Sequence, residues 1–104
     1  MKEDRRRYER IVLSENRLLP CQGISRPLVG QVSVLGTGGM YIRTTNTYPL
    51  GTEIELRIQA DAEVLDAPCV VRDVTPGGLG VEFTWLRGPL EEKLQKILAR
   101  LKPD

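Results

Sequence analysis

Residues 53 to 59 alternate strictly between polar and apolar side chains, and no other feature of the chain constrains its fold so closely. Within this segment the apolar residues Ile54, Leu56 and Ile58 fall at every second position. Successive side chains of a β-strand point to opposite faces of the sheet, so the alternation predicts a strand with one buried face.

Further segments of strand length are rich in β-branched and apolar residues and are separated by turn residues. They cover residues 12–21, interrupted near 14–16, and residues 28–34, 40–44, 69–74 and 79–83. With residues 53–59 they make six predicted strands. Residues 48–51 are predicted to form a type I turn, and residues 75–78 a type II turn with Gly77 third, so that consecutive strands run antiparallel.

The last segment changes from the period of a strand to that of a helix. Its apolar residues, at helical spacing, are Leu90, Leu94, Ile97, Leu98 and Leu101. Acidic residues in the first turn and basic residues near the end complement the helix dipole. One amphipathic helix over residues 90–102 is therefore predicted, covering an open side or end of a β-barrel or sandwich.

The chain has 104 residues, 40% of them hydrophobic, which suffices for one core but not for two ordinary domains. Cys21 and Cys69 lie in strand-like stretches, without a C-x-x-C motif and without any histidine. We expect reduced core cysteines, no disulfide scaffold and no metal site. No segment approaches a signal sequence or the roughly 20 apolar residues of a membrane span, so a cytoplasmic protein is expected, without membrane insertion.

The composition argues against catalysis and against general nucleic-acid binding. A chain without histidine lacks the usual base for a nucleophile, and neither cysteine has a visible activating neighbour. The sequence therefore predicts no catalytic residues and no enzyme. A net charge of +1 provides no overall field toward DNA or anionic lipid.

Four arginines, Arg5, Arg6, Arg7 and Arg10, cluster before the first predicted strand. A guanidinium group is always charged, forks onto phosphate or the guanine edge, and stacks on aromatic rings. Such a cluster can hold both the phosphates and the bases of a guanine nucleotide. Taken alone, it can also be a solvated charge run balanced by the acidic residues around it.

A glycine-rich segment, residues 30–42, lies between two of the predicted strands. It exposes backbone N–H groups and contains the Ser33 hydroxyl, both suited to a phosphate, but it lacks the Gly-Lys-Ser/Thr of a P-loop. The simpler interpretation is a hairpin whose glycines serve only to turn the chain.

Taken together, these segments resemble the PilZ domain family. The family motif RRxxR matches residues 6–10, and its second motif, (Asp/Asn)-x-Ser-x-x-Gly, most nearly matches Gln31, Ser33 and Gly36. Residues 38–44, 51–52 and 78–83 are also similar to segments of such domains, so the resemblance covers nearly the whole chain. Gln31 departs from the family pattern, and two extra residues separate Gly36 from the family's glycine pair.

A second alignment matches Gly38-Gly39 to that glycine pair. Gly36 then takes the serine position and Val34 the acidic one, so the second motif is lost. We prefer the first alignment, because glutamine carries the same amide as the permitted asparagine and because Ser33 keeps a hydroxyl.

The resemblance implies an all-β fold, a six-stranded antiparallel β-barrel of the PilZ-like split type with one C-terminal α-helix. Residues 1–10 would be a flexible arginine-rich arm, and residues 11–104 the barrel domain with its helix. It further implies binding of the bacterial second messenger cyclic di-GMP on the outside of the barrel, with no cofactor. The implied ligand-binding residues are Arg5, Arg6, Arg7, Arg10, Gln31, Ser33 and Gly36.

Signal transfer is expected to need a downstream partner protein, with the arm becoming ordered as ligand binds, and a homodimer stays open. The rival interpretation is a PilZ-like adaptor that has lost the nucleotide, which Gln31 and the longer loop both permit. A third, an RNA-binding barrel, is disfavoured by the small net charge and by an aromatic content of 5%.

Overall fold

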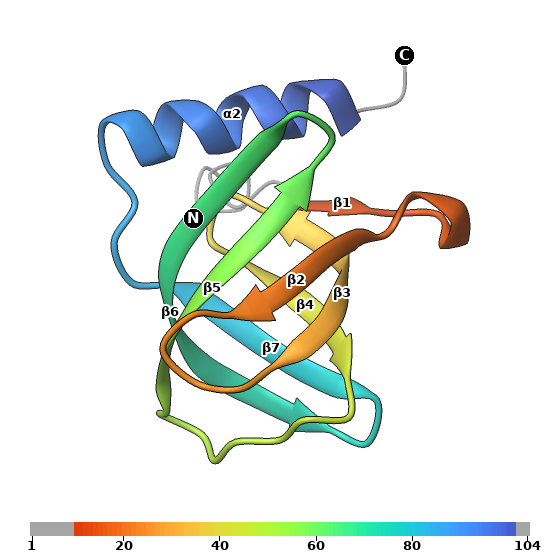
Figure 1. Ribbon diagram of the computed structural model, residues 1–104, viewed down its shortest axis with the longest axis vertical. Helices are drawn as coiled ribbons and strands as arrows, with labels where there is room; N and C mark the ends of the chain where they lie inside the picture. Colours follow the sequence, from red (N-terminus) through yellow and green to blue (C-terminus); the bar gives the residue numbers. More distant parts are fainter. Residues whose placement is uncertain (1–9, 102–104) are drawn as a thin grey trace, which may run out of the picture.

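The computed structural model describes residues 10–101 and consists of β-strands with one C-terminal helix (Figure 1). The strands are β1 (Arg10–Val12), β2 (Leu19–Gly23), β3 (Val29–Gly36), β4 (Gly39–Thr44), β5 (Glu53–Ala60), β6 (Glu63–Thr75) and β7 (Gly78–Phe83). A 3₁₀ helix, η1 (Glu15–Arg17), follows β1, and α2 (Pro89–Leu101) ends the described chain.

Six of the strands close into an antiparallel barrel in the order β3-β2-β5-β6-β7-β4, with β4 pairing back onto β3. The predicted six-stranded barrel with a C-terminal helix is therefore confirmed. Closure removes the unpaired edges that an open sheet would leave.

The predicted strand over residues 12–21 is divided into β1 and β2, and the interruption expected near residues 14–16 is the 3₁₀ helix η1. Both strands lie along the same edge of β3. β2 pairs with residues 29–32 and β1 with residues 34–36. β1 thus extends the barrel wall past the end of β2 instead of adding a seventh strand to the closed barrel (Figure 1).

Strand β6 is much longer than the predicted residues 69–74. Its first half pairs with all of β5, from Ala60 opposite Glu63 to Glu53 opposite Val70. The hairpin turns at Asp61, whose φ of 55° is in the left-handed region that aspartate tolerates. Proline and acidic residues in this half weaken its strand pattern, and only pairing with the regular β5 makes it extended.

Both predicted turn types are wrong. Thr52 N donates to Pro49 O at 3.1 Å and Gly51 has a φ of 87°, which fits a type II turn over residues 49–52, one residue later than predicted. Gly77, expected to have a positive φ, does not, since Gly51 and Gly88 are the described glycines with that backbone. The β6–β7 turn therefore needs no left-handed residue.

The interior of the barrel is filled by the inward-pointing residues of the strands. Ile54, Leu56 and Ile58 are all buried, as the alternation predicted. Cys21 and Cys69 are also buried and form no disulfide, which confirms that they are small core residues. Burial raises the pKa of each of the two thiols to about 12, because a thiolate in the core would lose its hydration.

Helix α2 lies across one end of the barrel, beside the β5–β6 hairpin (Figure 1). It buries Leu94, Ile97 and Leu98 and is tied to β6 where Lys93 Nζ donates to Val64 O at 3.0 Å. The predicted span of residues 90–102 starts one residue late, and its last residue lies outside the described chain. No helix within residues 10–101 has the length and apolarity needed to cross a membrane.

Candidate functional site

A groove of about 940 Å³ runs over the outside of the barrel, across four of its strands and the start of β1. Polar and apolar side chains share its lining with several glycines. It is lined by Arg10, Val34, Gly38, Gly39, Met40, Tyr41, Arg72, Asp73, Gly80, Val81 and Glu82. These residues come from β1, β3, β4, β7 and β6, which pair side by side in that order, so the pairing of strands brings them together.

Arg10 forms one rim of this groove. It begins β1 directly opposite Gly36, the last residue of β3, and its side chain is exposed. The last arginine of the RRxxR motif therefore lies beside the glycine-rich hairpin. Arg5, Arg6 and Arg7 lie outside the described residues.

A β-bulge at Ser33 decides which side chains of β3 reach the groove. Val32 pairs with Ile42 and Val34 with Tyr41, so Ser33 is the additional residue. Ser33 is buried, at 6% exposure, and its carbonyl accepts a hydrogen bond from Leu13 N at 2.9 Å. The bulge turns Val34 outward, and Val34 lines the groove.

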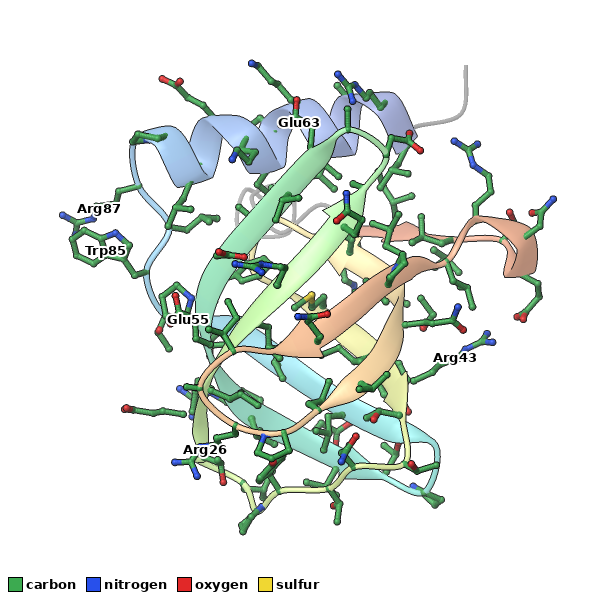
Figure 2. All side chains as sticks on the ribbon, viewed as in Figure 1. Arg26, Arg43, Glu55, Glu63, Trp85 and Arg87 are labelled. Carbon is green, nitrogen blue, oxygen red and sulfur yellow. The ribbon has the colours of Figure 1, made fainter. Side chains whose placement is uncertain are left out.

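Gln31 lies on the other side of the bulge, exposed on the outer face of β3 between Pro20 and Arg43. Its neighbour Arg43 forms a two-point ion pair with Glu15, at 2.9 and 2.6 Å. That pair raises the pKa of Arg43 and lowers the pKa of Glu15. In Figure 2 Arg43 points away from the barrel wall. Of the described site residues predicted from sequence, Arg10 lines the groove and pairs with Gly36, whereas Gln31, Ser33 and Gly36 itself are not part of the lining.

Glycines leave the middle of the groove without protruding side chains. A Cβ atom on Gly39 would lie 2.1 Å from Val81 O, and one on Gly80 would lie 3.1 Å from the Asp73 Cβ. The backbones of β4 and β7 therefore approach closely at Gly39, and no side chain rises from either position. A flat ligand could lie against this backbone surface.

The far rim is formed by β6, which has a second bulge at Arg72, between Val71 and Asp73. Arg72 Nε donates to Glu82 Oε1 at 2.7 Å, and both side chains line the groove. Between the two rims lies Tyr41, whose hydroxyl shares a hydrogen bond with Thr75 Oγ1. Sequence reasoning missed Tyr41, Arg72 and Glu82, because no motif or spacing connects residues that separate strands contribute.

A second hollow, of about 590 Å³, lies around Arg26 and Glu55. There Arg26 Nε already donates to Glu53 O at 2.7 Å, and its guanidinium lies 6.0 Å from the Tyr48 ring. Nearby in Figure 2, Arg87 lies over the exposed Trp85 ring, at 4.9 Å. Within residues 10–101, no group of three or more potential metal ligands comes together.

Solved structures with the same fold include two from Escherichia coli. The PilZ domain of YcgR with c-di-GMP matches with a TM-score of 0.77 at 18% identity, over 93% of this chain and 91% of that one. YcgR in complex with c-di-GMP matches with a TM-score of 0.76 at 21% identity, over 93% of this chain but 46% of that one. The uncharacterized Legionella protein Lpg0364 matches with a TM-score of 0.63 at 15% identity, over 90% and 94% of the two chains.

These TM-scores establish a shared fold. No curated protein sequence matches the chain significantly. The sequence model of the PilZ domain, in contrast, matches residues 4–100, from the arginine cluster to the end of the helix. The resemblance noted in the sequence is thereby confirmed, and the chain belongs to the PilZ domain family.

Proposed function

We propose that this PilZ domain is a receptor for cyclic di-GMP, which it binds in the groove on the outside of its barrel and which it does not chemically change. The observation that carries the proposal is the pairing of Arg10 with Gly36. This pairing puts the end of the RRxxR motif at the rim of a groove whose middle is glycine backbone.

The size and chemistry of the groove agree with such a ligand. Its volume of about 940 Å³ lies within the range of small-molecule sites. Arginine at the rim can bind phosphate or a guanine edge, and the Tyr41 ring and the glycine backbone offer surface to a base. The two YcgR structures with the same fold are described as holding c-di-GMP.

The geometry supports the second of the two alignments more than the first. Val34 lines the groove, whereas Gln31 and Ser33 lie outside the lining, and Gly36 pairs with Arg10 whichever alignment is used. In that alignment Val34 and Gly36 stand where the family has an acidic or amide residue and a serine. Binding by this chain would then depend mainly on arginine, from Arg10 and from Arg5, Arg6 and Arg7.

Binding is proposed to order the arginine arm against the barrel and so change the surface offered to a downstream protein partner. An anion that bridges the arm and the barrel would offset the cost of ordering, about 1 to 2 kcal/mol for each backbone residue fixed. Hydrogen exchange of the arm with and without saturating ligand measures this step, and unchanged protection would argue against it.

Isothermal titration with cyclic di-GMP tests the receptor function, with GMP and GTP as controls at physiological salt. The proposal expects selective binding at micromolar concentration or below. Absence of both heat and a thermal shift would instead favour the adaptor function. The apolar Val34 and the glycine at position 36, at motif positions where the family has polar side chains, agree with that alternative. Binding of all three nucleotides alike, with a steep dependence on salt, would indicate a general phosphate-binding surface.

A further inference from the structure

The bulge in β6 adds an arginine to the groove at the rim opposite Arg10. Val71 pairs with Val81 and Asp73 with Gly80, so Arg72 is the additional residue of β6. A regular strand would alternate inward and outward side chains, but here Arg72 and Asp73 are adjacent and both exposed on the groove side. Since a bulge of this kind redirects a side chain, it provides a structural reason for Arg72 to face the groove.

Arg72 forms an ion pair with Glu82 of the neighbouring strand β7. The Nε–Oε1 distance is 2.7 Å, and the two side chains are 64% and 52% exposed. Ion pairs this exposed contribute little to stability, because water solvates the separated charges almost as well. The pair can therefore open at small cost, and Glu82 would stay solvated once Arg72 had left it.

We propose that Arg72 is a second anion-binding residue of the groove, and that Glu82 holds it in place until a phosphate of the ligand replaces the carboxylate. The inference rests on the proposed binding of cyclic di-GMP, which carries two phosphates and two guanines. Arg10 on β1 and Arg72 on β6 then contact the ligand from opposite rims. A phosphate offers the guanidinium the same two-point geometry as a carboxylate, so the exchange keeps the charge of Arg72 paired.

Arg72→Ala tests the contact. Loss of one two-point arginine contact is expected to weaken cyclic di-GMP binding about tenfold in isothermal titration, with the melting temperature nearly unchanged. Arg57→Ala is the matched control, since Arg57 forms an ion pair of the same 2.7 Å length with Asp66 but lies on β5, outside the groove lining. Equal affinity of Arg72→Ala and Arg57→Ala would overturn the assignment.

Glu82→Gln tests the exchange. Freed from its carboxylate, Arg72 should bind the ligand up to about fivefold more tightly, which corresponds to the strength of an exposed ion pair. In an Arg72→Ala background the same substitution should have no effect, because there is no arginine left to release. A gain that persists in that background would mean that Glu82 merely repels the ligand, and would overturn its role as a competitor for Arg72.

The unchanged protein separates failure of this inference from failure of the receptor function. If it binds no cyclic di-GMP, the proposed function fails and the inference fails with it. If it binds and Arg10→Ala weakens binding while Arg72→Ala does not, the receptor function stands and the second anion-binding residue is refuted.

Discussion

Arg10 and Gly36 face each other across the β1–β3 pair, one at the start of its strand and the other at the end. Between them they join the two segments that stood out in the sequence, the arginine cluster and the glycine-rich hairpin. The 3₁₀ helix η1 makes this possible, because it interrupts the strand after β1 and leaves β1 to follow β3 beyond the end of β2.

Arg10→Ala is expected to reduce the affinity for cyclic di-GMP by about 1 to 3 kcal/mol, the worth of one two-point arginine contact. Its melting temperature should stay close to that of the unchanged protein, because Arg10 is exposed. Titration calorimetry and thermal denaturation measure the two effects. Arg17→Ala, an exposed arginine of η1, is the control, and equal binding by both variants would refute the role of Arg10.

The two alignments of the second motif make opposite predictions. If the groove lining identifies the motif, Val34→Asn restores an amide where the family has Asp or Asn and should tighten binding, whereas Gln31→Ala should leave it unchanged. If Gln31 is the motif residue, Gln31→Ala should cost on the order of 1 kcal/mol while Gln31→Asn holds the affinity. Titration of the three variants decides between the alignments, and a loss confined to Gln31→Ala would reject the groove-based one.

Gly78→Ala should destabilise the barrel by about 2 kcal/mol or more, because the added Cβ would lie 2.0 Å from Ile42 O and would push β7 away from β4. Gly77→Ala is a matched control one residue earlier. Its Cβ would meet nothing nearer than the Tyr41 hydroxyl at 3.6 Å, and its φ is not positive. Its effect on the free energy of unfolding should stay within about 0.5 kcal/mol. Urea denaturation of both variants measures the two free energies of unfolding. A loss in Gly78→Ala as small as that in Gly77→Ala would show that β7 can shift to make room for the added Cβ.

The two buried thiols predict a loss of stability in alkali. Their pKa in the folded protein is raised from 9.0 to about 12, so between these values the unfolded state releases protons that the folded state keeps. Stability is therefore full below pH 9 and falls as the pH rises toward 12. Urea midpoints measured from pH 8 upward should show the decline, with a shallower slope in Cys21→Ala. Rapid labelling of both thiols in the folded protein at pH 8 would contradict their burial.

Much of the architecture was predictable because it depends on local periodicity. The alternation around Leu56 specifies a strand with one buried face, and the spacing of Leu94, Ile97 and Leu98 specifies a helix with one apolar side. Prediction failed where the local sequence pattern was weak, or where the same residues are compatible with more than one local structure. The first half of β6 is extended because β5 pairs with it, and the turn at Gly51 lies one residue from its predicted position because hydrogen bonding, not residue type alone, selects the turn.

The candidate site shows the same division. Sequence patterns were sufficient to identify the family, the barrel with its terminal helix, and the arginine and glycine segments that were predicted to bind a ligand. The folded structure was needed to show that Val34, and not Gln31, lines the groove, and that Arg72 lies at its far rim beside Glu82. A bulge adds one residue to one strand and reverses the facing of the residues beyond it. Because a bulge exists only in relation to the partner strand, the sequence of one strand does not reveal it.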